Sequence, residues 1–339
     1  MNDVKVAVLG VGSMGANHAR AYAEMDSVRL VGVADTDERA ARRIARRYGC
    51  TAYGRFTELL EEERPDLVSV AVPTKLHADV AEEAMSRGVH VLVEKPLAPS
   101  VEEGRAIIDS AAAHGVKLMV GHIERFNPAV TEIKRRLATG ELGRIFQVHA
   151  RRLSPFPGRI SDVGVILDLA SHDLDVMHHL LGSDVERVFA ETEQKAHATC
   201  EDLVSALIRF SNGVIGLLDV NWLTPTKVRT LTVLGEGGMY VADYLTQDVY
   251  WHKNTPVGTS YDSLNVFRGA WEGDMVKVRL DKKEPLRAEL ESFVAAVTGD
   301  TEPEVTGLDG LYAIDLAMTL MEAGRRHQPL EPGGVRVGT

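Results

Sequence analysis

Three polar side chains in this sequence have the types and spacing needed for proton transfer: Lys95, Asp168 and His172. Lys95 stands in the run Glu94-Lys95-Pro96, directly after an apolar stretch, and a lysine there can donate a hydrogen bond to a hydroxyl or carbonyl oxygen. Asp168 and His172 are four residues apart in an apolar helical pattern, where a carboxylate can orient an imidazole and increase its basicity. The set predicts a general base, its orienting group and a cation that stabilises charge on oxygen.

A glycine-rich turn, Gly10-Val11-Gly12-Ser13-Met14-Gly15, lies between a strand-like stretch and a helical one. Glycines at this spacing allow a tight turn, close approach of a pyrophosphate and close helix–strand packing. The phosphates are expected at the N-terminus of the helix, with a ligand-free tight turn as the alternative. The predicted contacts of the cofactor phosphates are Gly10, Gly12, Ser13, Met14 and Gly15.

Asp35 follows the second strand-like stretch, 20 residues after Gly15. A carboxylate at this place is expected to accept hydrogen bonds from an adenosine ribose and to repel a 2′-phosphate, which favours NAD over NADP. Arg39, Arg42 and Arg43 follow on the next helix. They either offset this preference or form a solvated helix face.

Further candidates follow other strand-like stretches. Pro73, Thr74 and His77 are expected to line the cofactor, as are Glu94, Lys95 and His122, although His77 can also simply begin a helix. Arg125 is expected to bind a substrate oxygen or a phosphate, or to form a salt bridge that links domains.

The helical pattern expected over Val165–Leu181 continues the Asp168/His172 spacing to Asp175 and His179, so that all four side chains share one face. Asp175, His178 and His179 are interpreted as structural. Two Asp and two His could ligate a metal, but hydride transfer from an alcohol needs none, and no metal is expected. A Glu–Lys surface ion pair and an Asp–His helix-surface contact are the structural alternatives to catalysis.

The elements that position these residues change character near residue 122. Before it, parallel βαβ units are predicted, which form a doubly wound α/β domain of Rossmann type over residues 1–122. The strands are expected at Val4–Leu9, Arg29–Ala34, Leu67–Val72, Val89–Val93 and Lys117–Val120, and the helices at Ala16–Met25, Glu38–Tyr48, Ala78–Arg87 and Val101–His114.

Residues 123–339 are predicted to form an α+β domain with a largely antiparallel open sheet. Hairpin turns are expected at Ser211-Asn212-Gly213 and Gly235-Glu236-Gly237-Gly238. Strands are expected at Ile145–Arg152, Val188–Glu193, Leu203–Phe210, Val214–Asn221, Arg229–Leu234 and Met239–Asp243, and helices at Ala129–Leu137, Val165–Leu181, Leu286–Val297 and Leu308–Arg325.

The composition narrows the class of protein. The formal net charge of −11 argues against a broad nucleic-acid-binding surface. Only two cysteines occur, which excludes a disulfide scaffold and favours a reducing compartment. No apolar run reaches the roughly 18 residues of a membrane span, and a strand pattern from Val4 leaves no room for a secretory leader. A cytoplasmic location without membrane contact is expected.

Together, the glycine turn, the Pro73-Thr74/His77 segment, Glu94-Lys95-Pro96 and the Asp168/His172 pair resemble the glucose–fructose oxidoreductase / inositol dehydrogenase / rhizopine catabolism (Gfo/Idh/MocA) family over nearly the whole chain. The resemblance implies a Rossmann domain and a second domain whose open sheet often serves oligomer contacts, here a homo-oligomer (dimer or tetramer). It also implies that Lys95, Asp168 and His172 match the family's catalytic positions.

Within that family, segments 121–130 and 162–170 look like those of UDP-N-acetylglucosamine 3-dehydrogenases. The resemblance implies NAD-dependent oxidation of a sugar ring hydroxyl, with the C3 hydroxyl of UDP-N-acetylglucosamine or of a related nucleotide sugar as first choice. Dehydrogenation of myo-inositol or another free sugar or polyol is the alternative enzyme activity. A non-catalytic NAD-binding regulator is the alternative from another class, but it would not need Lys95, Asp168 and His172.

Overall fold

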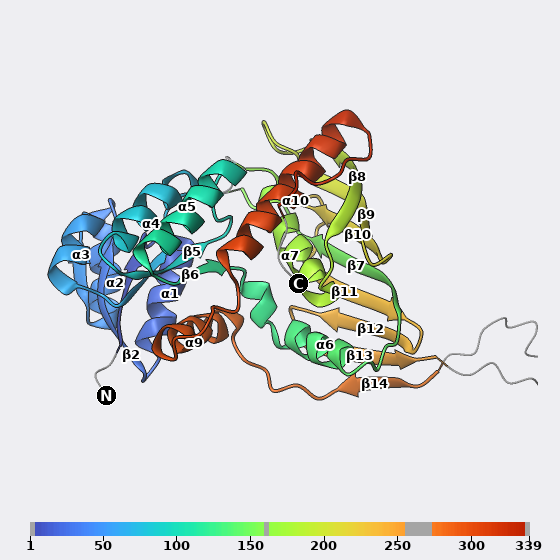
Figure 1. Cartoon of the computed structure of the whole chain (residues 1–339), viewed down its shortest axis with the longest axis horizontal. Coiled ribbons are helices and arrows are strands. Elements are labelled where there is room, and N and C mark those ends of the chain that lie inside the picture. Colours follow the sequence, from blue (N-terminus) through green and yellow to red (C-terminus); the bar gives the residue numbers. More distant parts are fainter. Residues whose placement is uncertain (1–3, 159–162, 255–272, 336–339) are drawn as a thin grey trace, which may run out of the picture. The chain divides into compact units, whose positions relative to one another are not determined.

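The computed structural model describes residues 4–158, 163–254 and 273–335 (Figure 1). Residue 162 of the segment 162–170, and residues 336–339 of the C-terminal tail, lie outside these ranges. The chain forms two compact units. Of the described residues, unit 1 comprises those up to Phe126, Lys283–Leu316 and those from Gly333 on, and unit 2 comprises those from Asn127 to Lys282 and Ala317–Pro332.

Unit 1 contains a parallel sheet with the strand order β3-β2-β1-β4-β5-β6. Every neighbouring pair is parallel, and β4 and β6 are buried along their whole length, as expected for a sheet covered on both faces. The doubly wound α/β prediction is confirmed. The strands are β1 (Val4–Leu9), β2 (Val28–Ala34), β3 (Thr51–Tyr53), β4 (Leu67–Val70), β5 (His90–Glu94) and β6 (Leu118–Gly121).

Helices cover both faces of this sheet (Figure 1). α1, α2 and α9 pack together as one layer, and α3, α4 and α5 as the other. The helices are α1 (Ser13–Ala23), α2 (Glu38–Tyr48), α3 (Phe56–Glu63), α4 (His77–Met85), α5 (Val101–His114) and α9 (Pro285–Thr298), with the 3-10 turns η1 (Thr74–Leu76) and η2 (Ile123–Phe126).

Two elements of unit 1 were not expected from the sequence. β3 has three residues and begins at the exposed Thr51, so it is too short to show an alternating pattern. α3 has eight residues, only about two turns, and its apolar side is correspondingly short. A third difference is the return of α9 from the end of the chain, which places a distant helix beside α1.

Unit 2 contains a second sheet with the order β14-β13-β12-β11-β7-β10-β9-β8. Among its strands only β7 and β10 pair in parallel, so the prediction of a largely antiparallel sheet is confirmed. The strands are β7 (Ile145–Leu153), β8 (Val185–Glu193), β9 (Leu203–Phe210), β10 (Ile215–Asn221), β11 (Val228–Gly235), β12 (Gly238–Asp243), β13 (Asp248–Lys253) and β14 (Met275–Val278).

The sheet of unit 2 has two unlike faces. Burial alternates along β9, β11 and β12, which is the pattern of a sheet covered on one side. α6 (Pro128–Ala138) packs on β12 and β13, and α7 (Ser171–Leu181) packs on β7. Both expected hairpins are present, joining β9 to β10 and β11 to β12.

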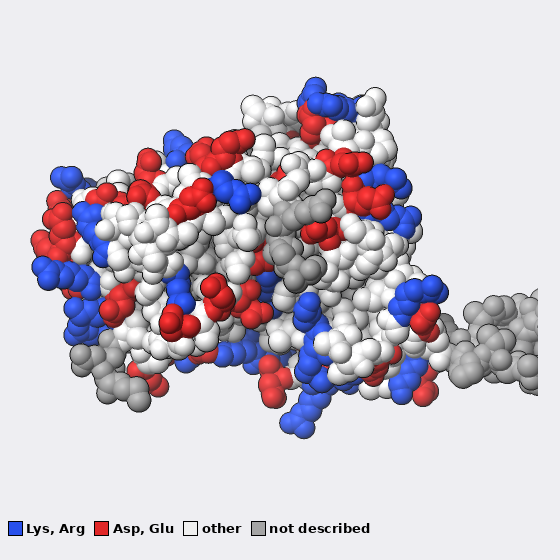
Figure 2. Space-filling model, in the orientation of Figure 1, with Lys and Arg blue, Asp and Glu red and all other residues white. Residues whose placement is uncertain are grey.

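The last helix, α10 (Gly307–Arg326), contributes residues to both units. Among the described residues, no helix is both long enough and apolar enough to cross a bilayer. Acidic and basic side chains are interspersed on the face shown in Figure 2 rather than gathered by sign.

Candidate active site

The glycine turn joins β1 to α1, and its glycines serve different purposes. Gly10 has a φ of +88°, and a Cβ on Gly15 would lie 1.8 Å from the carbonyl oxygen of Gly10. The fold itself therefore requires these two glycines. A Cβ on Gly12 would meet nothing within 4 Å among the described residues. Gly12 thus leaves open space at the start of α1, where a phosphate can approach the backbone.

The N-terminus of α1 offers backbone donors to that space. Gly12 is the N-cap residue and has no side chain, and the first turn of α1 carries no acidic residue. The free N–H groups and the helix dipole favour an anion there. The turn therefore fits a pyrophosphate.

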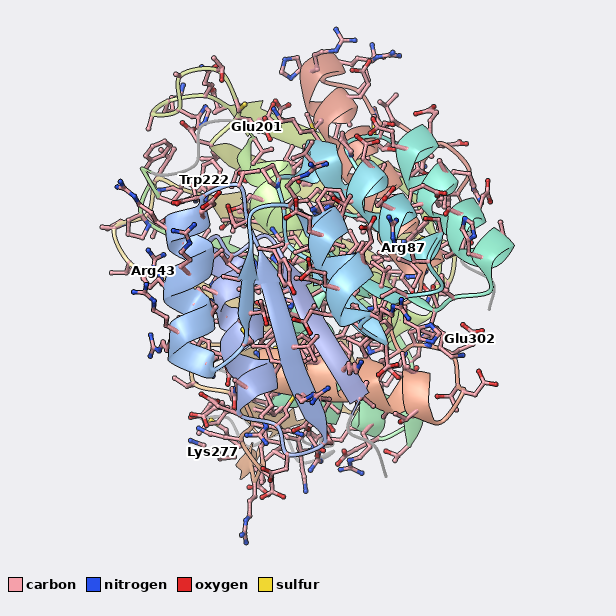
Figure 3. All side chains as sticks on the ribbon, turned by 90° about the vertical axis from the view of Figure 1, so that its left-hand side faces the viewer. Arg43, Arg87, Glu201, Trp222, Lys277 and Glu302 are labelled. Atoms are coloured by element: carbon pink, nitrogen blue, oxygen red, sulfur yellow. The ribbon has the colours of Figure 1, made fainter. Side chains whose placement is uncertain are left out.

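Asp35 lies directly after β2 and next to the glycine turn. Its Oδ2 accepts a hydrogen bond from the backbone N–H of Val11 at 2.7 Å, and its Oδ1 accepts one from Asp37 at 2.8 Å. The carboxylate is therefore held in one position beside the proposed phosphate site. On α2, Arg42 pairs with Glu38, and Arg43, labelled in Figure 3, lies on the exposed side of the helix.

The other candidates of unit 1 follow the carboxyl ends of β4, β5 and β6. Because these strands are parallel to β1, their ends lie at the same edge of the sheet as the glycine turn. The strand order reverses between β1 and β4, which is where open α/β sheets bind ligands. The candidates at this edge are Pro73, Thr74, His77, Glu94, Lys95 and His122.

His77 begins α4 and connects two backbone segments. Its Nε2 lies 2.9 Å from the carbonyl oxygen of Val72, and its Nδ1 lies 3.0 Å from that of Pro96. Burial lowers the pKa of His77 below its ordinary value, and the backbone carbonyl groups oppose this shift only in part. His77 therefore ties the end of β4 to the turn that carries Lys95.

Glu94 and Lys95 differ in their exposure. Glu94 is buried, with 7% of its surface exposed, and a Cβ on Gly121 of β6 would lie 3.1 Å from its carboxyl carbon. Glycine at 121 therefore leaves room for this carboxyl group. Lys95 is half-buried, and its backbone N–H donates to Oε2 of Glu94 at 3.2 Å.

His122 and Arg125 belong to the segment after β6. His122 is buried, and its carbonyl oxygen accepts the backbone N–H of Arg125 at 3.1 Å. The guanidinium group of Arg125 pairs with Asp309 at 2.8 Å. Burial alone raises the pKa of Asp309, but the charge and hydrogen bond of Arg125 lower it overall. Arg125 therefore forms a buried ion pair within unit 1, so this pair is not the domain-linking salt bridge expected as one of its two roles.

In unit 2, Asp168 and His172 lie on two different kinds of helix. Asp168 is in η3 (Ile166–Ala170), a π-helical turn, and His172 is in the first turn of α7. The backbone N–H of Ser171 bonds to the carbonyl oxygen of Ile166, five residues back, so the expected single α-helix over Val165–Leu181 is wrong. Such wide turns are frequent at functional sites. Asp168 and His172 are both half-buried.

The expected polar face of that helix is also incomplete. His179 is half-buried like Asp168 and His172, but Asp175 is buried. The wider turn changes the angle between Asp168 and the residues after Ser171, so a regular 100° step does not apply across it.

Several site-supporting residues were missed in the sequence. Glu201 accepts the backbone N–H of Ile166 at 3.1 Å and holds the start of η3. Arg152 of β7 binds Asp173, the neighbour of His172. In unit 1, His18 of α1 contacts Glu94, and Glu289 of α9 is fully buried nearby. The one available signal was a polar residue at a core position of an apolar helix, as with His18 and Glu289.

Comparisons with known proteins agree with this architecture. Residues 4–122 match the family described as "Oxidoreductase family, NAD-binding Rossmann fold", and residues 130–241 match the "GFO/IDH/MocA C-terminal domain". The chain is 31% identical to UDP-N-acetylglucosamine 3-dehydrogenase of Acidithiobacillus ferrooxidans, covering 95% of this chain and 98% of that protein. It is 26% identical to scyllo-inositol 2-dehydrogenase (NAD(+)) of Bacillus subtilis, covering 97% and 96%.

Solved structures show the same fold. A structure of the Acidithiobacillus ferrooxidans enzyme superposes with a TM-score of 0.85 at 29% identity, covering 96% of this chain and 99% of that one. Levoglucosan dehydrogenase in complex with NADH gives a TM-score of 0.85 at 20% identity, covering 98% and 100%. The chain therefore belongs to the GFO/IDH/MocA oxidoreductase family and is an NAD(P)-dependent dehydrogenase that acts on a CH–OH group.

Proposed function

We propose that this enzyme uses NAD to oxidise a ring hydroxyl of a sugar, with the C3 hydroxyl of UDP-N-acetylglucosamine as its first-choice substrate. The observation that carries the proposal is that the open glycine turn and Lys95 share the carboxyl edge of one parallel sheet. Residues 1–122 bind the dinucleotide in this proposal, and residues 123–339 bind the substrate and mediate self-association.

The residues at the sheet edge fit NAD. The space beside Gly12 accommodates a pyrophosphate, and the fixed carboxylate of Asp35 can accept hydrogen bonds from a ribose while repelling a 2′-phosphate. Bound NAD supplies the hydride acceptor. The residues proposed to hold it are Gly10, Gly12, Ser13, Met14, Gly15 and Asp35 at the adenosine and phosphate end, and Pro73, Thr74, His77, Glu94, Lys95 and His122 toward the nicotinamide end.

Three side chains carry the proton and charge chemistry in this proposal. His172 removes the proton of the substrate hydroxyl, and Asp168 orients its imidazole. Lys95 donates a hydrogen bond to the same oxygen and stabilises the negative charge that develops on it. The half-buried state of all three side chains supports this role, since each is accessible and yet partly shielded from water. Arg125 acts indirectly, because its pair with Asp309 fixes the segment that carries His122.

The replacement Lys95→Met tests the assignment. Methionine keeps the length of the side chain and removes its charge and donor. We expect kcat to fall about 10²- to 10⁴-fold while NADH binding, measured by fluorescence titration, stays close to that of the unmodified enzyme. Near-normal turnover with intact NADH binding would overturn the proposal.

Lys117→Met is the matched control. Lys117 precedes β6 at the amino edge of the same sheet and pairs with the exposed Asp300 at 3.0 Å. A pair with one highly exposed partner contributes little to stability, so this variant should keep both NADH binding and turnover.

The substrate is proposed from the comparisons. The similarity to a UDP-N-acetylglucosamine 3-dehydrogenase over nearly the whole of both chains supports the nucleotide sugar. Several inositol dehydrogenases also match, one at 35% identity over 191 residues, which makes a polyol such as myo-inositol the second candidate. NADH formation should be measured with UDP-N-acetylglucosamine, free N-acetylglucosamine and myo-inositol. Turnover of myo-inositol alone would overturn the first choice.

Self-association and location complete the proposal. Leu207 on β9 is half exposed, and it lines a hollow together with Phe189 of β8 and Ile215 of β10. Apolar side chains on a sheet face without a helical cover favour contact with a second copy of the chain. Light scattering should give a dimer or tetramer, and a monomer at micromolar concentration would contradict this part. The free thiols of Cys50 and Cys200 support a cytoplasmic location.

A further inference from the structure

A buried polar cluster lies inside unit 1, next to the residue that precedes Lys95. We call it the His18 cluster, and it consists of His18 and Tyr22 from α1, Ser69 from β4, Glu94 from β5 and Glu289 from α9. His18 and Glu289 are 0% exposed. Burying so many polar groups in a core is costly unless they bind one another in a defined way.

The hydrogen bonds of the cluster form a chain. The hydroxyl of Tyr22 lies 3.0 Å from Oγ of Ser69, Oγ of Ser69 lies 3.0 Å from Nδ1 of His18, and Nε2 of His18 lies 2.8 Å from Oε1 of Glu94. Burial raises the pKa of Tyr22, so its phenol stays protonated and can donate. One direction of donation, from Tyr22 through Ser69 and His18 to Glu94, satisfies each atom of the chain.

The chain ends on a carboxylate. Burial by itself raises the pKa of Glu94, but the hydrogen bond and charge of His18, together with the charge and backbone N–H of Lys95, lower it overall. Glu94 is therefore ionised and can only accept hydrogen bonds. His18 binds its Oε1 and the backbone N–H of Lys95 binds its Oε2, so both carboxylate oxygens are fixed.

Glu289 adds a second buried carboxyl group to the cluster. The nearest ligating atoms of His18, Glu94 and Glu289 all lie within 4.8 Å of one another. Two carboxyl groups this close in a buried site repel each other when both are ionised. The Nε2–H donor of His18 fixes the Glu94 carboxylate at this crowded place. His77 also interacts electrostatically with Glu94, and Lys95 supplies the remaining nearby cation.

We propose that His18 is a positioning residue for Lys95: it fixes the Glu94 carboxylate, and Glu94 in turn binds the backbone N–H of Lys95 and attracts its side chain. The inference rests on the role proposed above for Lys95. His18 touches neither cofactor nor substrate in this proposal. It acts only through Glu94, from within the helix that also carries the glycine turn.

The reactivity of the Lys95 amine tests the inference without any turnover. The full-length protein, with and without NADH, is labelled by reductive methylation at several pH values, and the rate at Lys95 is measured by peptide mass spectrometry relative to Lys117. In His18→Leu the buried Glu94 carboxylate loses its imidazole donor, so Lys95 loses a fixed opposite charge. The relative rate at Lys95 should therefore increase about tenfold at pH 8. His18→Gln, which can still donate to Glu94, should restore part of the difference.

Two further variants complete the experiment. Glu94→Gln keeps the shape of the side chain and should reproduce the increase seen in His18→Leu, which also serves if the leucine variant does not fold. His114→Leu is the matched control, because His114 also pairs with a glutamate, Glu82, but on the exposed surface at 3.3 Å. It should leave the rate at Lys95 unchanged. An unchanged rate in folded His18→Leu and Glu94→Gln would overturn the inference.

The same variants separate this inference from the proposed function. We expect His18→Leu to lower kcat with little change in KM and to shift the pH profile of kcat, which a merely structural role would not do. If Lys95→Met is inactive but the labelling rate at Lys95 is unchanged in the His18 variants, only the inference fails. If Lys95→Met stays active, the proposed function fails whatever the labelling shows. Stoichiometric metal in the purified protein, lost in Glu289→Gln, would instead make the cluster a metal site and overturn the inference.

Discussion

Arg152 and Asp173 form a bidentate ion pair in the core of unit 2. Nε of Arg152 lies 2.6 Å from Oδ2 of Asp173, and Nη2 lies 3.1 Å from Oδ1. The two side chains are 1% and 2% exposed. Because Asp173 directly follows His172, the pair fixes the first turn of α7 to the end of β7 and thereby limits how the proposed base can move.

Breaking this pair should be costly. Asp173→Asn breaks a buried ion pair by removing one partner, which typically costs about 3–5 kcal/mol. Urea unfolding should show this loss in the free energy of unfolding, and kcat should fall because His172 loses its support. The double variant Arg152→Met/Asp173→Leu removes both charges and should recover most of the stability without recovering kcat. Equal stability of Asp173→Asn and the unmodified protein would contradict this account.

Gly12 offers a test that separates cofactor binding from folding. A methyl group at Gly12 would meet no described atom within 4 Å, and the φ of −62° suits alanine. Gly12→Ala should therefore keep the melting temperature but weaken NADH binding about tenfold or more, since the methyl group occupies the space proposed for the pyrophosphate.

Gly15→Ala is the contrasting control. Its Cβ would lie 1.8 Å from the carbonyl oxygen of Gly10, so this variant should lose stability before any effect on binding can be measured. If Gly12→Ala binds NADH as tightly as the unmodified protein, the phosphates are not held beside Gly12.

The elements around the cofactor could be predicted because their signals are local. Apolar strands that alternate with helices predict parallel βαβ units. The glycine turn lies between β1 and α1, as its position in the sequence predicted. Asp35 follows the second strand as expected and lies beside the turn. Each of these predictions used only residues close together in the sequence and the rule that a strand, a helix and a strand form a parallel βαβ unit.

The supports of the site could not be predicted in the same way. His18 and Glu94 are 76 residues apart, and Arg125 and Asp309 are 184 residues apart. The periodicity of apolar residues in a sequence does not indicate which distant polar side chains will contact each other in a core. The π-turn at η3 was missed for a different reason: apolar spacing near three to four residues fits both helix types, and the contacts of Glu201 with this segment are again long-range.

Cofactor preference should depend on the charge of Asp35. Asp35→Asn keeps the size of the side chain and one acceptor oxygen for the backbone N–H of Val11 or Asp37. The loss of the negative charge removes the repulsion of a 2′-phosphate. We expect the ratio of the Kd for NADPH to the Kd for NADH to fall about tenfold, measured by fluorescence titration.

Asp37→Asn provides the control for this change. Asp37 caps α2 by accepting the backbone N–H groups of Arg39 and Ala40, and asparagine is also a good N-cap. This variant should keep the NADPH to NADH ratio. A ratio that moves equally in both variants would show that local charge in general, rather than Asp35, sets the preference.

His77 should make the folded state sensitive to acid. Burial lowers the pKa of His77 in the folded protein, whereas the unfolded chain has the ordinary value of about 6.5. The unfolded state therefore binds more protons as the pH falls below about 6.5, and the contribution of His77 to stability, fully present above that pH, is lost as the pH approaches the lower folded value.

The variant His77→Gln measures this contribution. At pH 8 it should be less stable, because one amide replaces an imidazole between the carbonyl groups of Val72 and Pro96, and a lost buried hydrogen bond costs about 1–3 kcal/mol. Between pH 7.5 and 5.5 its free energy of unfolding should fall less steeply than that of the unmodified protein. His90 and His149, whose pKa values are also lowered by burial, remain in both proteins, so their effect cancels in the difference. His114→Gln, on the surface, should keep the original slope, and parallel slopes for His77→Gln and the unmodified protein would show that His77 is not the acid-sensitive group.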